Sequence, residues 1–249
     1  MIKIAICGCN GKMGHVIYSC LSDRENCTVV GGIDLNTTQY ADFPIVSAPD
    51  KLPVKPDVII DYSHPSTLDG LIEYALTSGV AVVFATTGYS AEQITKIKTA
   101  AEQVPIFFTF NLSLGINLLV ELAKKTAAFL GDQFDIEIIE KHHNQKIDAP
   151  SGTAIMIADA INSVFDDSYQ YVYDRHSQRK KREKKEIGMH SIRGGTIVGE
   201  HEVVFAGRDE VITLSHSATS KEVFAVGSVN AAFFLKDKPA GLYSMADLV

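Results

Sequence analysis

The sequence predicts an α/β protein with a doubly wound parallel sheet, followed by a second α+β domain with a mixed or antiparallel sheet. In the first third of the chain, short and wholly apolar runs rich in β-branched residues alternate with helical patterns. Strands that are apolar on both faces are typical of parallel sheets covered by helices. Two later segments alternate apolar and polar residues, which is typical of antiparallel strands with one covered face.

The strands predicted for the first domain are residues 2–7, 28–33, 58–60 and 80–85. Ser66 with Asp69 resembles an N-terminal capping box and predicts a helix start between the third and fourth strands. Ser90 with Gln93 forms the same pattern, and Gly79 has the position of a C-terminal cap. This βαβ order implies right-handed crossovers, as in a doubly wound sheet.

The pattern changes near Ser113, where a second unit is predicted to begin. The polar stretch at residues 166–188, rich in Lys and Arg, has no sustained apolar period and predicts a loop. The regular elements predicted around it are a helix at 114–130 ended by Gly131, a strand at 135–140, a helix at 152–163, strands at 200–206 and 211–216, and an apolar helix at 221–235.

Composition and charge favour a soluble globular protein and exclude polyanion binding as the main function. The chain has 249 residues, 46% of them hydrophobic, and a net charge of −7 from 30 acidic and 23 basic residues. The run 179–186 holds six basic residues but no aromatic ones, so it predicts a solvated loop rather than a nucleic-acid site. We therefore expect neither nucleic acid nor membrane as a partner.

The N-terminus and the cysteines indicate the cytoplasm. Residue 1 leads straight into a strand pattern, so no secretory leader is expected. The four cysteines lie within the first 27 residues, in a spacing that matches neither a disulfide framework nor a zinc site. Buried, reduced thiols are the interpretation we adopt.

A glycine-rich turn follows the first strand directly and opens a helix. Gly8, Gly11 and Gly14 form a GxxGxxG arrangement that is typical of Rossmann-type dinucleotide-binding domains. Gly8 is expected to make the tight turn, Gly11 to let the backbone approach the pyrophosphate, and Gly14 to allow close helix packing. The helix N-terminus then meets the phosphate charge.

Asp34 ends the second strand, twenty residues beyond Gly14, where an acidic side chain accepts hydrogen bonds from the adenosine ribose. The same carboxylate repels the additional phosphate of NADP. No arginine stands beside it, although Lys12 can partly offset the repulsion. The sequence therefore predicts NADH as the preferred cofactor, with NADPH possible.

The stretch 140–153 (EKHHNQKIDAPSGT) combines groups that suit an anionic substrate that is protonated as it is reduced. His142 can donate or relay a proton near neutral pH, and Lys146 adds positive charge. A substrate carboxylate is expected at the amides of Gly152 and Thr153, because a helix begins there.

This stretch, read as ExHHxxKxDAPSGTA over residues 140–154, resembles the signature of the dihydrodipicolinate reductase family. Further landmarks of that family recur in order: ATTG at 85–88 resembles its GTTG loop, FNLS at 110–113 its ANFS-like segment, SIRGG at 191–195 its SxRGG turn, and GEH at 199–201 a strand start. The resemblance covers essentially the whole chain. It implies NAD(P)H-dependent reduction of 4-hydroxy-tetrahydrodipicolinate, a cyclic imine with two carboxylates, with loss of water, in the diaminopimelate route to lysine.

The resemblance also implies site residues and an assembly. His142 and Lys146 become the catalytic groups, His143, Gly152 and Thr153 the substrate-binding groups, and no metal is involved. Residues 1–112 and 221–249 form the dinucleotide domain, residues 113–220 form the substrate and oligomerisation domain, and a homotetramer is expected. The cofactor contacts fall on Gly8, Cys9, Asn10, Gly11, Lys12, Met13, Asp34, Ala85, Thr86, Thr87, Thr109, Phe110, Asn111 and Leu112.

Three positions depart from the family pattern. Ala85 replaces a glycine, Leu112 replaces an aromatic residue that often lies near the nicotinamide, and His64 stands where an arginine is common. The methyl group of Ala85 is expected to restrict the approach of the backbone to the cofactor.

Other functions stay open on the residues alone. A non-catalytic dinucleotide-binding redox sensor is the alternative from another class, and a different imine or aldehyde reductase is the enzymatic rival. A zinc site is disfavoured because His142 and His143, as neighbours on a strand, point to opposite faces. A hydrolase is disfavoured because Ser151 lacks a nucleophile elbow.

Overall fold

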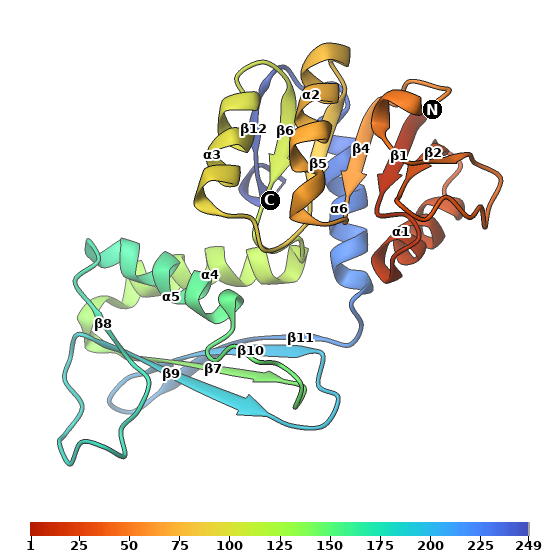
Figure 1. Cartoon of the computed structure of the whole chain (residues 1–249). Helices are drawn as coiled ribbons and strands as arrows, with labels where there is room; N and C mark the ends of the chain where they lie inside the picture. The colour runs from red at the N-terminus through yellow and green to blue at the C-terminus, as the bar shows by residue number, and fades with distance from the viewer. Residues whose placement is uncertain (249) are drawn as a thin grey trace. The chain divides into compact units, whose positions relative to one another are not determined.

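The computed structural model describes residues 1–248. In it the chain forms two compact units, the first made of residues 1–113 and 222–249 and the second of residues 114–221. Figure 1 shows both, coloured along the chain. The roles expected for the two units, dinucleotide binding and substrate binding, stay predictions.

The sheet of the first unit has seven strands, and every pair of neighbours in it is parallel. The order across the sheet is β12-β6-β5-β4-β1-β2-β3, so the chain winds outward from β1 in both directions, as predicted for a Rossmann-type sheet (Figure 1). The strands are β1 (Ile2–Cys7), β2 (Cys27–Ile33), β3 (Ile45–Val46), β4 (Val58–Asp61), β5 (Ala81–Phe84), β6 (Pro105–Phe108) and β12 (Gly241–Tyr243).

Helices cover both faces of this sheet, which is why its strands are largely apolar. On one face, α1 (Lys12–Ser22) and α6 (Glu222–Leu235) pack in a core with Ile4, Ile60 and Val83. On the other face, α2 (Leu68–Ser78) and α3 (Ala91–Ala100) pack in a core with Ala5, Ile59 and Val82. Neighbouring strand residues thus alternate between two cores, as the parallel sheet predicts.

Two of the three helix-end signals predicted in the first unit are confirmed. Gly79 ends α2 in the left-handed region at φ +71°, and Ser90 with Gln93 forms a reciprocal capping box at α3. The capping box predicted at Ser66 and Asp69 is wrong. A turn of 3-10 helix precedes α2, and the Ser66 amide and hydroxyl bond instead to Nδ1 of His64.

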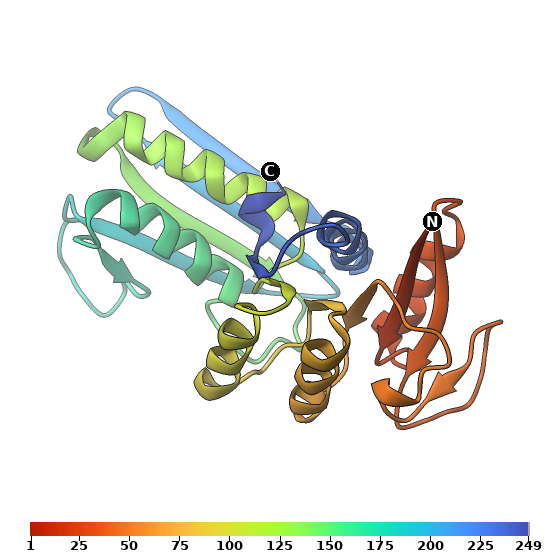
Figure 2. The same ribbon diagram turned by 90° about the horizontal axis from the view of Figure 1, so that it is seen from above.

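The second unit is a mixed sheet with two helices on one face. Strands β10 and β11 are antiparallel, as are β10 and β7, whereas β9 is parallel to both β7 and β8. The helices α4 (Leu114–Leu130) and α5 (Gly152–Asn162) lie side by side over the same face, where they form one core with the sheet (Figure 2). The strands are β7 (Asp135–His142), β8 (Gln170–Val172), β9 (Glu186–Arg193), β10 (Gly199–Ala206) and β11 (Val211–Ala218).

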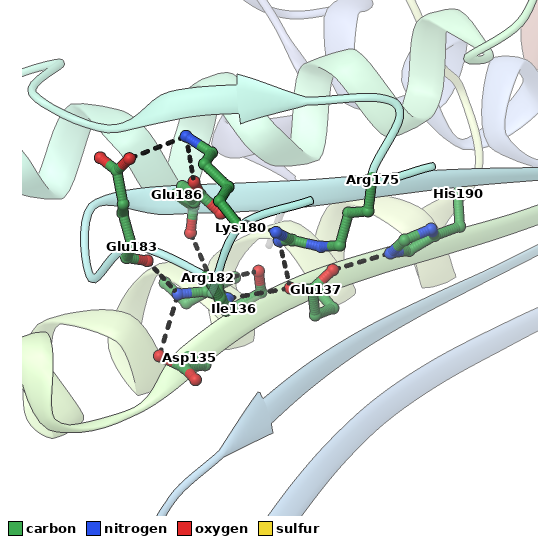
Figure 3. Close-up of polar contacts among 9 residues, drawn as sticks. All are labelled: Asp135, Ile136, Glu137, Arg175, Lys180, Arg182, Glu183, Glu186 and His190. Atoms are coloured by element: carbon green, nitrogen blue, oxygen red, sulfur yellow. Dashed lines mark hydrogen bonds and ion pairs between the residues drawn. The ribbon is translucent and has the colours of Figure 1, made fainter. Parts of the chain in front are cut away.

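The prediction of a loop through residues 166–188 is wrong at two places. Residues 170–172 form β8, and β9 begins at Glu186. Glu186 is a buried carboxylate that pairs with Arg175 at 2.8 Å, so a charged residue occupies a buried strand position and hides the apolar period. Arg182 fixes the remaining turn by donating to the side chains of Asp135 and Glu137 (Figure 3).

Short 3-10 helices complete the fold at Pro49–Lys51, Pro65–Thr67, Gly131–Gln133, Ser163–Phe165 and Met245–Asp247. Within residues 1–248, no helix has both the length and the apolar character needed to cross a bilayer. The four cysteines are free thiols, with Cys20 partly exposed and the others buried.

Candidate active site

The glycine-rich loop fits the backbone geometry that a dinucleotide needs. Gly8 has φ +78°, and a side chain there would also meet the backbone oxygen of Tyr62 at 2.5 Å. A side chain at Gly14 would lie 2.3 Å from the oxygen of Gly8, so the helix can begin this close to the loop only with glycine. No side chain caps the N-terminus of α1 and its first turn holds no acidic residue, so its backbone amides suit a pyrophosphate.

Asp34 is hydrogen-bonded to this loop. Its Oδ2 atom accepts a hydrogen bond of 3.0 Å from the amide of Asn10, and its Oδ1 atom accepts one from Asn36. The Cys9 side chain is fully buried, and this burial, with the charge of Asp34, raises the thiol pKa to about 12. The buried Cys9 thiol is therefore not available to a dinucleotide.

Asp61 is a site residue that the sequence reasoning missed. It ends β4 and is fully buried, and it accepts hydrogen bonds from the hydroxyls of Thr86 at 2.8 Å and Tyr89 at 2.9 Å. Burial raises the pKa of the Asp61 carboxyl. The signal in the sequence was an acidic residue at the end of an otherwise apolar strand.

Through these bonds Asp61 holds the segment 85–87, which follows β5 at the same edge of the sheet as the glycine loop. The Thr86 hydroxyl is already bonded to Asp61, so we expect Thr86 to contact the cofactor through its backbone. Ala85 does not have a positive φ, so a glycine is not required there by the backbone conformation.

The segment 109–112 follows β6 and contains one exposed and one buried apolar side chain. Phe110 is 76% exposed, whereas Leu112 is 4% exposed and belongs to the core beneath the sheet. A side chain at Gly227 of α6 would lie 1.7 Å from the oxygen of Leu112, so the two backbones are in direct contact. The expected contact of Leu112 with the cofactor is therefore left to its backbone, while Phe110 offers an exposed ring.

His142 ends β7 in the second unit, and its Nδ1 atom lies 2.6 Å from Oε2 of Glu140. Glu140 is 1% exposed and is bound by both terminal nitrogens of Arg193. Burial alone would raise the pKa of Glu140, but the hydrogen bonds from Arg193 and His142 outweigh it and lower the pKa to about 2. An ionised carboxylate thus lies behind the His142 ring.

Lys146 and His143 lie in the turn after β7. The ammonium of Lys146 pairs with the carboxylate of Asp148 at 2.9 Å, and this contact lowers the pKa of Asp148. Asp148 is largely exposed, so an anionic ligand can compete with it for the lysine. The Nδ1 atom of His143 is buried and has no hydrogen-bond partner within residues 1–248.

Helix α5 begins at Gly152 after the N-cap Ser151, whose hydroxyl accepts a hydrogen bond from Ala154. No acidic residue lies in the first turn, so the positive end of the helix is not neutralised within it. His201 of β10 contacts the Ser151 hydroxyl at 3.1 Å, and burial lowers its pKa to about 4. A neutral His201 therefore contacts the N-cap Ser151 at the start of α5.

The predicted site residues thus fall into two groups. All those expected to bind the cofactor lie in the first unit, after the carboxyl ends of β1, β2, β5 and β6. All those expected to bind the substrate or act on it lie in the second unit, between the end of β7 and the start of α5. Residues 1–248 contain no cluster of three or more His, Cys, Asp or Glu side chains arranged to hold a metal ion.

Residues 2–112 match the model of the dihydrodipicolinate reductase N-terminus, and residues 115–249 match the model of its C-terminus. The chain belongs to the dihydrodipicolinate reductase family. The matches confirm the predicted family and the predicted class, an NAD(P)H-dependent oxidoreductase of the diaminopimelate route to lysine. Membership in the dihydrodipicolinate reductases favours an enzyme over the non-catalytic sensor.

Full-length relatives agree with this family. The 4-hydroxy-tetrahydrodipicolinate reductase of Caldanaerobacter subterraneus subsp. tengcongensis is 49% identical over 249 residues, which is 100% of this chain and 98% of the relative. That of Clostridium tetani is 46% identical over 98% of this chain and 96% of the relative. A dipicolinate-bound dihydrodipicolinate reductase from Paenisporosarcina sp. TG-14 has a TM-score of 0.84 at 26% identity, covering 100% of both chains.

Proposed function

We propose that this chain reduces 4-hydroxy-tetrahydrodipicolinate to tetrahydrodipicolinate with loss of water, using His142 and Lys146 as its catalytic groups. The observation that carries the proposal is the arrangement after β7, where a ring backed by an ionised carboxylate, a lysine and a helix start with no acidic residue in its first turn lie within one short segment. Each of these groups is suited to a dianionic substrate that takes up a proton.

The substrate-binding role falls to His143, Gly152 and Thr153. A carboxylate of the substrate fits the start of α5, where backbone amides and the helix dipole favour an anion. Lys146 exchanges its exposed partner Asp148 for a substrate carboxylate at little cost, because an exposed ion pair contributes only about 0–1 kcal/mol. A relative at 26% identity is described as bound to dipicolinate, a ligand of the same dicarboxylate class.

Proton transfer is the chemical task of this segment. The 4-hydroxyl and a ring hydrogen leave as water, hydride adds to the conjugated carbon–carbon double bond, and His142 and Lys146 supply the proton that completes the reduction, while the C=N bond is retained. The positive charge of Lys146 also stabilises the negative charge that develops on the substrate. A bound NADH or NADPH supplies the hydride.

The first unit supplies the cofactor site. Gly8 and Gly14 permit the close turn of the loop, since a side chain at either position would meet neighbouring backbone atoms, and Asp34 lies beside the loop for the ribose. We propose NADH as the preferred cofactor because the Asp34 carboxylate repels a 2′-phosphate. NADPH remains usable, since Lys12 at the start of α1 offsets part of this repulsion.

We further propose a cytoplasmic homotetramer assembled through the sheets of the second unit. Helices α4 and α5 cover one face of that sheet, while Ile139 and Val204 lie on the other, partly exposed face. The free thiols suit a reducing compartment. Light scattering should give about four times the 27.1 kDa chain mass. A monomer would contradict the tetramer.

The reaction is tested by following NADH absorbance, and separately NADPH absorbance, after adding enzyme to substrate made in situ from pyruvate and aspartate semialdehyde. We expect rapid oxidation of both cofactors, with the higher kcat/KM for NADH. Tight dinucleotide binding without oxidation would contradict the proposed reaction. A higher kcat/KM for NADPH would contradict only the cofactor preference.

A further inference from the structure

The carboxylate of Glu140 is saturated with hydrogen-bond donors. Its Oε1 atom accepts hydrogen bonds from Nη2 of Arg193 at 2.7 Å and from the Ser151 amide at 3.1 Å. Its Oε2 atom accepts a hydrogen bond of 2.8 Å from Nη1 of Arg193 and lies 2.6 Å from Nδ1 of His142. The side chain is 1% exposed, so these protein groups take the place of water around the charge.

This saturation fixes which nitrogen of His142 carries a proton. An ionised carboxylate can only accept hydrogen bonds, so Nδ1 of His142 must be the donor in the contact with Glu140. The low pKa of Glu140, about 2, keeps the carboxylate ionised near neutral pH. In the neutral ring, Nε2 is then the nitrogen without a proton.

The space around Nε2 is kept open by a glycine. A side chain placed at Gly199, the first residue of β10, would lie 3.2 Å from Nε2 of His142. That approach is closer than ordinary van der Waals contact, and it would press on the nitrogen that has no bond to Glu140. The Gly199 position therefore leaves room beside Nε2.

Arg193 holds the carboxylate in place from a third element. It lies at the end of β9, pairs with His142 in the register of β7 and β9, and grips both oxygens of Glu140. Its Nη2 atom also donates to the backbone oxygen of Asp148 at 2.7 Å. One guanidinium therefore ties Glu140 to the turn that carries Lys146.

We propose that Glu140, clamped by Arg193, is a positioning residue that fixes His142 with Nδ1–H on the carboxylate and Nε2 as the only nitrogen that exchanges a proton with the substrate. The inference rests on the proposed catalytic role of His142. It extends that role by naming the reacting atom and the two residues that set it.

Glu137 provides a matched control on the same strand. It too is a carboxylate bound by arginines and a histidine, with Arg175 and Arg182 at 3.0 Å and His190 at 2.7 Å (Figure 3). Since β7 alternates its side chains, Glu137 lies on the face opposite to Glu140 and away from His142. Glu137→Gln therefore removes a similar ion-pair network without touching the His142 ring.

The first test reads the tautomer directly in the wild-type protein, and the His142→Asn variant serves only to assign the signal. In 15N-labelled enzyme with a neutral His142 ring, assigned by its loss in His142→Asn, the chemical shifts should show a protonated Nδ1 and an unprotonated Nε2. A predominant Nε2–H form would overturn the proposal. In Glu140→Gln the amide group can donate to Nδ1, so the population should move toward Nε2–H.

The second test is kinetic. Glu140→Gln should lower kcat about 10- to 100-fold, the range found when the hydrogen-bond partner that orients a metal-binding histidine is replaced, and leave the Kd for NADH within about twofold. Glu137→Gln, checked for the same oligomeric state, should keep its kcat within about twofold. A wild-type kcat in Glu140→Gln would overturn the positioning role.

Failure of the inference and failure of the proposed function are distinguishable. Unchanged turnover in His142→Asn would reject the catalytic role of His142, whatever the tautomer is. The tautomer measurement would still report whether Glu140 fixes the ring. Slow turnover in His142→Asn combined with a normal Glu140→Gln enzyme would reject the inference alone.

Discussion

The hydroxyl of Thr86 donates a hydrogen bond of 2.8 Å to Oδ2 of Asp61, a carboxylate that is fully buried at the end of β4. This bond connects the segment after β5, which is expected to contact the nicotinamide, to the centre of the parallel sheet. Tyr89 and Ser63 donate to the same carboxylate. The cofactor-facing edge of the first unit is thus organised around one buried acid.

Asp61→Ala should lower the free energy of unfolding by about 3 kcal/mol, because the hydroxyls of Thr86 and Tyr89 lose a buried acceptor. Asp61→Asn keeps an acceptor oxygen and should cost about 1 kcal/mol. Urea unfolding followed by circular dichroism measures both. Equal stability of Asp61→Ala and wild type would show that the carboxylate does not organise this edge.

Gly14→Ala should weaken NADH binding at least about tenfold, or about 1.4 kcal/mol, because its methyl group would push against the Gly8 and Cys9 carbonyls. Gly70 lies in α2 with open space around its Cα, so Gly70→Ala is the matched control. It should leave binding unchanged and stabilise the helix by about 0.5–1 kcal/mol. Fluorescence titration with NADH compares the two, and equal affinities would contradict a pyrophosphate site at this loop.

Asp34→Asn should raise the ratio of kcat/KM for NADPH over that for NADH about tenfold, since the variant removes a charge that repels the 2′-phosphate. Its amide oxygen can still accept from Asn10. Asp57 also accepts an amide hydrogen bond, but it lies before β4, at the opposite edge of the sheet. Asp57→Asn should leave the ratio unchanged, and a constant ratio in Asp34→Asn would remove Asp34 from cofactor selection.

The stability of the second unit should depend on pH through Glu140. Its pKa in the folded chain is about 2, against an ordinary value of 4.5, so its contribution is present above about pH 4.5 and is lost as pH falls toward 2. The free energy of unfolding of wild type should exceed that of Glu140→Gln at pH 7. This difference should shrink by about 1 kcal/mol between about pH 7 and 3.5. A difference in the free energy of unfolding that increases as the pH falls would contradict an ionised Glu140.

The sequence predicts those features that depend on short stretches of chain. The turn at Gly8, the close approach at Gly14 and the alternation of β10 are local requirements, so they can be identified from a few neighbouring residues. The strand β9 is not predicted because its buried Glu186 depends on ion pairs with Arg175 and Lys180, eleven and six residues earlier in the chain. A buried charge that is paired with a distant residue interrupts the apolar pattern from which a strand would be predicted.

The candidate site shows the same division. The segment that carries His142 and Lys146 is contiguous, and its residues can be selected together from the sequence. Arg193 lies 53 residues from Glu140, and Thr86 lies 25 residues from Asp61. These partners become visible only when the sheets bring distant strands side by side.

The central claim is tested most directly by the steady-state oxidation of NADH in His142→Asn and Lys146→Met, each with its NADH affinity measured by titration. We expect kcat to fall at least about 100-fold in both variants, with the Kd for NADH within about twofold of wild type. Lys96→Met, which removes a surface lysine paired with Asp69 in the first unit, should behave as wild type. Wild-type turnover in His142→Asn and Lys146→Met would contradict the account.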